Sequence, residues 1–105
     1  MDHFTITLRE YKNSNFAGHV QIGTDIKYIN DTRVYLHHLH VIKAYRHKGE
    51  GTKLMYKAID TCKKLGIPRV YLWCIPKLIP FYKAFGAEDT HVITDGYHLM
   101  MIYIK

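Results

Sequence analysis

The stretch from residue 41 to residue 54, VIKAYRHKGEGTKL, constrains the fold of this chain more than any other feature. It joins a strand-like run to an amphipathic helix through a basic turn that contains Gly49 and Gly51. A strand, a turn and a helix in this order aim backbone N–H groups and the positive end of the helix at one point. Glycine lets the backbone approach a bulky anion without a Cβ in the way. The stretch therefore predicts a binding site for a phosphate or pyrophosphate.

The length of 105 residues predicts one small domain, 1–105, built on a single sheet-and-helix core. An apolar share of 48% and a charged share of 23% are typical of globular proteins and exclude the disordered and fibrous classes. The net charge of +6 favours anionic partners such as a nucleotide-bearing cofactor, nucleic acid or an acidic protein surface. A charge of this size also serves solubility alone, so it does not choose among these partners.

Cysteine usage and the N-terminal residues predict the cellular compartment. Cys62 and Cys74 lie within apolar patterns and lack metal-type spacing, which favours reduced thiols over a disulfide framework. The first residues show neither the basic nor the apolar region of a signal peptide, and no apolar run approaches the roughly 20 residues that span a bilayer. We therefore expect a cytoplasmic protein without membrane contact.

The hydrophobic patterns predict the element order β-β-β-α-β-α-β-β. A phase shift near Gly23 predicts a bulge in the second strand. The almost wholly apolar run 70–75 predicts a strand covered on both faces, parallel to the third strand by the right-handed crossover rule. The fold class is α/β (α+β), with a mixed, mostly antiparallel sheet and two helices. The expected elements are strands over 4–9, 18–29, 33–42 and 70–75, a helix between Gly51 and Gly66, a second helix over about 77–85, and a hairpin of 90–94 and 97–104 around Asp95-Gly96.

The element order and two motifs together resemble the GCN5-related N-acetyltransferases (GNAT). The family signature Q/R-x-x-G-x-G/A is matched by RHKGEG at 46–51, between a strand and a long helix. A second family motif, an aromatic-Tyr pair that leads into a helix-ending glycine, is matched by FYKAFG at 81–86. The resemblance covers the chain from about residue 33 in detail, and the first two strands by order only. It implies the GNAT-like acyl-CoA N-acyltransferase fold in a short member without the N-terminal helices.

The resemblance implies acetyl-CoA as the cofactor and coenzyme A as the product. The pyrophosphate would sit on the backbone N–H groups of the turn, with a hydroxyl at the start of the helix. The end of the third strand would offer its backbone to the pantetheine arm. Gly49 and Gly51 alone would also suit a tight turn that binds no ligand. The arginine three residues before the first glycine, as in the family signature, favours cofactor binding instead. The expected cofactor-binding residues are Leu39, Val41, Arg46, His47, Lys48, Gly49, Glu50, Gly51 and Thr52.

Acetyl transfer needs a proton for the departing thiolate, and Tyr82 matches the family tyrosine that supplies it. A phenol with an ordinary pKa near 10 is protonated at working pH. The alternative interpretation is a core aromatic in the apolar stripe of the second helix.

The catalytic base is expected among three histidines of the third strand. His37 coincides with one histidine of an H-x-H pattern found in a family member, and an imidazole could take the ammonium proton directly or through water. Alternation predicts that His37 shares a face with Leu39 and Val41, whereas His38 and His40 lie on the other face. His38, His40 or bound water are alternative bases, and His37 could also lack a catalytic task. A metal site at His38 and His40 would lack further ligands at a recognisable spacing.

Departures from the family pattern bear on the acceptor. Without the N-terminal helices the acceptor side is open, which suits an exposed amine on a macromolecule, most directly a lysine or N-terminus of a partner protein. Ile75 stands where the family often carries an asparagine that contacts the cofactor, and Ala87 replaces an aromatic residue. A non-catalytic acyl-CoA-binding or interaction module therefore stays open, as does a nucleic-acid-directed modifier or binder. Exposed sheet edges could also pair two copies into a homodimer.

Overall fold

The computed structural model describes residues 3–24 and 32–105. Its six strands form one sheet in the order β1-β2-β3-β4-β6-β5. Only the β3–β4 pair is parallel, and the other neighbours are antiparallel. The predicted element order, the mixed sheet and the parallel pair are confirmed. The elements are β1 (Thr5–Lys12), β2 (Asn15–Thr24), β3 (Val34–Val41), the 3-10 turn η1 (Lys43–Tyr45), α1 (Glu50–Lys64), β4 (Arg69–Cys74), the 3-10 turn η2 (Pro76–Leu78), α2 (Ile79–Lys83), β5 (Glu88–Thr94) and β6 (Tyr97–Tyr103).

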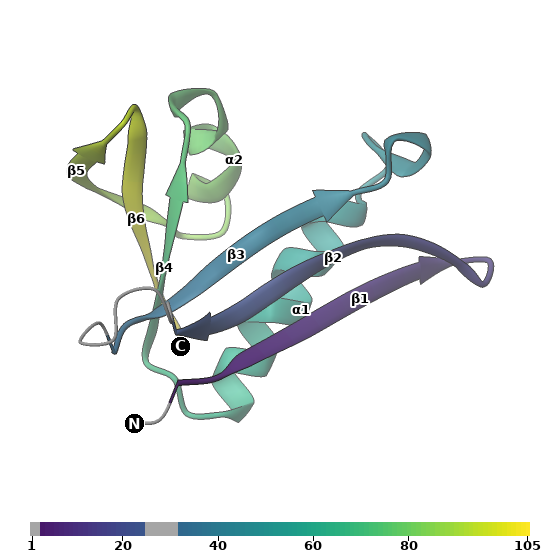
Figure 1. Cartoon of the computed structure of the whole chain (residues 1–105), viewed down its shortest axis with the longest axis horizontal. Coiled ribbons are helices and arrows are strands. Elements are labelled where there is room, and N and C mark those ends of the chain that lie inside the picture. The colour runs from purple at the N-terminus through teal and green to yellow at the C-terminus, as the bar shows by residue number, and fades with distance from the viewer. Residues whose placement is uncertain (1–2, 25–31) are drawn as a thin grey trace.

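Both helices cover the same face of the sheet, as Figure 1 shows. The apolar stripe of α1 is fully buried against this face and consists of Leu54, Met55, Ala58 and Cys62. Burying a leucine-sized side chain stabilises the fold by about 1.5–3 kcal/mol, so this stripe is what holds α1 on the sheet. Among the described residues, no helix has the length and apolarity to cross a bilayer.

The prediction that the fourth strand is covered on both faces is wrong. Val70, Leu72 and Cys74 are buried, whereas Arg69 and Trp73 on the other face are exposed. The reason is that α1 and α2 lie on one side of the sheet, and no element in the described part of the chain covers the opposite side of β4. We call this uncovered side the open face.

The predicted bulge at Gly23 is also wrong. Gly23 pairs with Thr5 on one side and Tyr35 on the other, without a break in register. A Cβ at Gly23 would overlap the carbonyl oxygen of Phe4, so glycine is needed here for close approach of β1. Residues 25–29 of the predicted second strand lie outside the described residues.

A bulge instead interrupts β3 at His38, which has a left-handed backbone with φ of 54°. Gln21 pairs with His37 and His19 pairs with His40, so two residues of β3 oppose one residue of β2. The extra residue reverses the alternation of the strand. Leu39 therefore packs against the core, where the sequence placed it on the face of His37. The prediction that His37 shares a face with Leu39 and Val41 is wrong for this reason.

The C-terminal hairpin turns at Asp95-Gly96 as predicted, because Gly96 adopts a left-handed backbone with φ of 81° and Thr94 pairs with Tyr97. The second helix is shorter than predicted. Its first turn is the 3-10 turn η2, and the α-helix proper begins at Ile79, next to Pro80. Proline lacks an N–H, so it is tolerated at the start of a helix and not within it.

Candidate functional site

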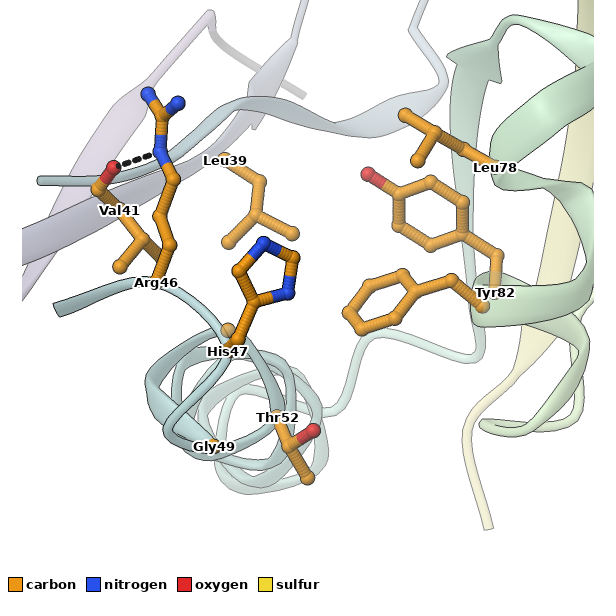
Figure 2. Close-up of a pocket in the computed structure, with 10 residues that line it drawn as sticks. Leu39, Val41, Arg46, His47, Gly49, Thr52, Leu78 and Tyr82 are labelled. Atoms are coloured by element: carbon orange, nitrogen blue, oxygen red, sulfur yellow. Dashed lines mark hydrogen bonds between the residues drawn. The ribbon is translucent and has the colours of Figure 1, made fainter. Parts of the chain in front are cut away.

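The candidate site begins where β3 and β4 separate. These parallel strands pair at Tyr35 and Tyr71, and beyond this pair they diverge (Figure 1). On the helix-covered side the separation opens into a pocket of about 360 Å³. Figure 2 shows Leu39, His47 and Tyr82 turned toward this space from three different elements. The pocket is lined by Leu39, Val41, Arg46, His47, Gly49, Gly51, Thr52, Leu78, Phe81 and Tyr82.

The basic turn supplies hydrogen-bond donors at the mouth of this pocket. His47 and Gly49 have left-handed backbones with φ of 62° and 83°, and Gly49 is the N-cap residue of α1. Among the described residues, no backbone carbonyl accepts a hydrogen bond from the N–H groups of residues 47–52. These groups and the positive end of α1 form a site that favours an anion.

Arg46 fixes the turn to the end of β3. Its Nε donates a hydrogen bond of 2.9 Å to the carbonyl oxygen of Val41, drawn as a dashed line in Figure 2. The first residue of the turn is thereby held against the end of β3 before a ligand binds. A preordered turn loses less entropy on binding than a flexible one.

The predicted cofactor-binding residues divide into two groups. All of them line the pocket except Lys48 and Glu50. Lys48 is exposed, and the Glu50 side chain is 1% exposed. Oε1 of Glu50 lies 3.4 Å from Nζ of Lys53 and 3.6 Å from Nζ of Lys12, while Oε2 meets no hydrogen-bond partner in the described part of the chain. The Glu50 side chain thus links the β1–β2 hairpin to α1, and only its backbone belongs to the turn.

Tyr82 lies on α2 at the far side of the pocket from the turn. Its half-buried ring packs against the core and meets the ring of Phe81 edge to face, with centroids 5.0 Å apart. Burial raises the pKa of the Tyr82 phenol above its ordinary value, and nearby Cys74 adds to this shift. The hydroxyl therefore stays protonated at neutral pH and can act as a donor. The Tyr82 side chain thus packs against the core and also lines the pocket, so both interpretations from the sequence apply to it.

His37 lies outside this pocket, on the open face. It pairs with Gln21, and its ring centroid is 5.5 Å from that of Tyr35 and 5.9 Å from that of His38. Tyr82 lines a pocket on the helix-covered side, so the structure does not bring Tyr82 and His37 into one cavity. No group of three or more His, Cys, Asp or Glu side chains suited to a metal ion is present among residues 3–24 and 32–105.

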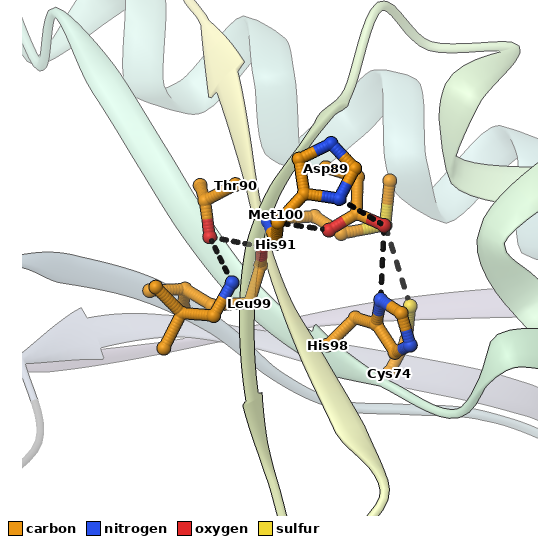
Figure 3. A network of polar contacts seen from close by, with 8 residues as sticks. Cys74, Asp89, Thr90, His91, His98, Leu99 and Met100 are labelled. Carbon is orange, nitrogen blue, oxygen red and sulfur yellow. Dashed lines mark hydrogen bonds and ion pairs between the residues drawn. The ribbon is translucent and has the colours of Figure 1, made fainter.

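An Asp-His pair in the C-terminal hairpin was missed by the sequence reasoning. Oδ2 of Asp89 lies 2.9 Å from Nδ1 of His98, and Oδ1 accepts a hydrogen bond of 2.8 Å from the backbone N–H of His91 (Figure 3). The His91 N–H, followed by His98, lowers the pKa of the Asp89 carboxyl. The hairpin signal at Asp95-Gly96 could have brought these positions together, but β5 is irregular between Asp89 and Ile93, which hides the register.

Both cysteines are free and buried. Burial raises the pKa of the Cys62 thiol to about 11 and also raises the pKa of Cys74. A thiol with a raised pKa is a poor nucleophile at neutral pH, so neither cysteine is suited to attack a substrate.

The chain matches known proteins in sequence and in fold. A family model described as the Acetyltransferase (GNAT) family matches residues 2–87. Among solved structures, the PaiA N-acetyltransferase of Thermoplasma acidophilum in complex with coenzyme A is similar with a TM-score of 0.78 and 20% identity, over 94% of this chain and 60% of that chain. Tetrahymena GCN5 is similar with a TM-score of 0.77 and 22% identity, over 96% and 69% of the two chains. A ribosomal-protein alanine N-acetyltransferase of Escherichia coli is similar with a TM-score of 0.77 and 18% identity, over 96% and 70%.

Proposed function

The chain belongs to the GNAT family of acetyltransferases, which use acetyl-CoA, and on that premise we propose that its acceptor is a primary amine of a partner protein, a lysine or an N-terminus. One observation carries acetyl transfer as the activity. A single pocket joins the N–H groups at the start of α1, which pair with no backbone carbonyl of the described residues, to the Tyr82 phenol, across the separation of β3 and β4. The first of these features suits a pyrophosphate, and the second suits the sulfur of a departing thiolate.

The residues of the pocket fit acetyl-CoA in their chemistry. The N–H groups of residues 47–52 would hold the pyrophosphate, with the Thr52 hydroxyl at the helix start. Leu39, Val41 and Leu78 give the middle of the pocket an apolar lining that suits the pantetheine arm. When bound, the cofactor supplies an acetyl group activated as a thioester.

Tyr82 and His37 divide the proton transfers of the reaction. The neutral amine attacks the thioester carbonyl, a C–N bond forms, and the C–S bond breaks. Tyr82 protonates the departing thiolate, for which its raised pKa keeps the proton available. His37 takes the proton of the attacking nitrogen, directly or through water, from the open face. His38, His40 or water alone are the alternatives for this second task.

Two features support a protein acceptor. The open face of β1–β4 offers a macromolecule the exposed side chains of Arg9, His40, Arg69 and Trp73, while Tyr35 in its middle is only 3% exposed. One protein of similar fold is named as an N-acetyltransferase of a ribosomal-protein alanine. We also propose that residues 1–105 form a single minimal acetyltransferase domain. Pairing of two copies through an exposed sheet edge stays a prediction.

A non-catalytic acyl-CoA-binding module is the second candidate. It is favoured by Ile75, an exposed apolar residue at the end of β4 where the family often carries an asparagine, and by the separation of His37 from the Tyr82 pocket. A third candidate, a nucleic-acid-directed modifier or binder, rests on the net charge of +6 alone.

The test is incubation of the purified chain with acetyl-CoA and a cell lysate, followed by mass spectrometry of acetylated residues. We expect new acetylated lysines or N-termini after incubation with the wild type, and we expect them to be missing when the Tyr82→Phe variant is used in its place. Tight acetyl-CoA binding without any acetylated product would instead favour the binding module. Acetylated nucleotides, or steep salt-dependent binding to nucleic acid, would favour the third candidate.

A further inference from the structure

We propose that the open face binds an acidic, extended protein segment, and that this segment carries the acceptor amine. That the segment carries the amine rests on the proposed function. The new part is the chemistry of the residues that flank this amine in the partner. It follows from the register of the sheet, the distribution of charge over the open face, and the aromatic rings that line it.

The strand register shows which side chains share the open face, because directly paired residues lie on the same side of a sheet. Starting from His37, the pairing extends the face to β1, β4 and β6. The cross-strand rows on this face are Arg9–His19–His40, Thr7–Gln21–His37, Thr5–Gly23–Tyr35–Tyr71–Met101, Trp73–Leu99 and Arg69–Tyr103.

The charge on this face is unevenly distributed. Arg9 and Arg69 are exposed and lie at its two ends. The acidic groups that border the face among the described residues belong to the β5–β6 hairpin: Glu88 pairs with Met101, and Asp95 lines a cavity with Trp73. The part formed by β1–β4 thus carries cations and imidazoles but no carboxylate in the described part of the chain. A positive surface on a chain of net charge +6 complements an acidic partner.

Aromatic rings cover much of the remaining surface of β1–β4. Phe16 stacks on His19 with ring planes 21° apart and centroids 6.1 Å apart, and His19 lies 5.9 Å from His40. Phe16 is 38% exposed and Trp73 is 39% exposed. Rigid, half-exposed rings offer contact area to a peptide at a low entropic cost. The open face therefore combines charge complementarity with apolar contact.

A peptide fits this surface better than a nucleic-acid strand does. Arg9 and His40 lie two residue pairs beyond the row of His37, which corresponds to about 7 Å along the strand. Arg69 lies two residues before Tyr71 on β4, and Tyr35, which pairs with Tyr71, lies two residues before His37 on β3. Arg69 is therefore about 14 Å from the level of His37 along the strands, in the direction opposite to Arg9. Arg33 adds a third guanidinium, which lies 5.5 Å and 5.3 Å from the ring centroids of Tyr35 and Tyr71. Separate guanidinium groups suit separate carboxylates, whereas a nucleic-acid backbone needs a continuous cationic track.

The same spacing predicts where the acidic residues of the partner lie. Arg9 also lies two strands from His37, and Arg69 one strand on the other side, which adds about 10 Å and about 5 Å across the sheet. An extended peptide that advances about 3.3 Å per residue should therefore carry one acidic residue about three to four positions from the acceptor lysine, and another about four positions away on the other side. A lysine placed between them reaches the level of His37 when both acids meet their arginines.

The experiment compares two peptides with blocked N-termini and a single lysine each. One carries Glu at these two positions, and the other carries Gln. With saturating acetyl-CoA, we expect kcat/KM for the Glu peptide to be higher by about fivefold, as two exposed ion pairs allow. The double variant Arg9→Gln/Arg69→Gln should bring this ratio close to one while leaving acetylation of the Gln peptide unchanged. Lys63→Gln, which removes a cation from the helix-covered side, is the matched control and should keep the ratio.

Several results would overturn the inference. Equal rates for the two peptides, a preference for a lysine-rich peptide, or a ratio that the double variant does not change would each show that the open face does not read acidic residues. Competition by a short single-stranded oligonucleotide, stronger than by the Glu peptide, would assign the face to nucleic acid. If no peptide is acetylated, the proposed function fails, and fluorescence anisotropy of the two labelled peptides then tests the docking surface separately. Tighter binding of the Glu peptide in that assay would support the surface, and equal binding would refute it.

Discussion

Tyr82 and His37 lie on opposite faces of the sheet, at the separation of β3 and β4. Tyr82 lines the pocket on the helix-covered side, whereas His37 pairs with Gln21 on the open face. The bulge at His38 produces this arrangement, because it directs Leu39 and Val41 into the pocket and leaves His37 on the other side. A thioester held in the pocket and an amine arriving from the open face would meet where the strands part. In the proposed mechanism, the two proton transfers therefore take place in two separate environments.

Tyr82→Phe should lower kcat for acetyl transfer by about 100-fold, because loss of a general acid typically costs two to four orders of magnitude. The dissociation constant for acetyl-CoA, measured by calorimetry, should stay within about twofold, since the ring still fills its place beside Phe81. Tyr56→Phe, which removes an exposed phenol from α1, is the control and should have no effect. Full turnover in Tyr82→Phe would show that the thiolate takes its proton from another source.

Gly49→Asp should abolish binding of acetyl-CoA, and Gly49→Asn should weaken it less. Both side chains have the same shape and tolerate the left-handed backbone of Gly49, so their difference isolates the added charge. A negative charge within a few ångströms of a pyrophosphate should weaken binding by at least about tenfold relative to Asn. Calorimetry of both variants measures this, and thermal unfolding checks that both fold. Equal affinities would place the pyrophosphate elsewhere.

Glu50→Gln should tighten acetyl-CoA binding by about two- to fivefold, because it removes a buried negative charge next to the proposed anion seat. Glu10→Gln is the matched control, because Glu10 pairs with Lys57 and not with a residue of the turn. Weaker binding in Glu50→Gln, with unchanged thermal stability, would contradict an electrostatic effect and would show that the contacts with Lys12 and Lys53 shape the turn.

Asp89 should contribute stability that depends on pH. Its pKa is lowered in the folded state, so the contribution is present above the ordinary pKa of an aspartate, near 4, and is lost as pH falls through the lower folded value. Urea unfolding of the wild type and of Asp89→Asn should therefore differ at pH 7, and the difference should shrink as the pH is lowered below about 4. Asp60→Asn, from an exposed pair with Lys64, is the control. A difference that persists at low pH would mean that the substitution disturbs the hairpin itself.

His37→Gln tests the base. If His37 accepts the proton of the amine, the fall in kcat/KM on the acid side of the pH profile should weaken or disappear, because that fall reports protonation of the base in the free enzyme. The same variant should bind acetyl-CoA as the wild type does, since His37 lies outside the pocket. An unchanged acid limb would transfer the task to His38, His40 or water.

Local patterns predicted the features that depend on neighbouring residues. The turn at 46–51, the stripe of α1 and the hairpin at Asp95-Gly96 are determined by residues close together in the sequence, and the structure places them as expected. The bulge at His38 could not be predicted, because a single extra residue in a strand of mixed aromatic and polar residues leaves no break in composition. The contact of Asp89 with His98 depends on an irregular register between two strands. The open side of β4 depends on where both helices pack, which an apolar run does not reveal.

The central claim is most directly tested by the stoichiometry of one reaction: coenzyme A thiol released per acetylated amine, measured with the purified chain, acetyl-CoA and a protein substrate identified from the lysate. We expect one thiol released for each acetylated lysine or N-terminus, with the rate reduced in Tyr82→Phe and no reaction in Gly49→Asp. Thiol release without acetylated protein, or acetyl-CoA binding without thiol release across all amines, would contradict the claim that this pocket transfers acetyl groups to a protein.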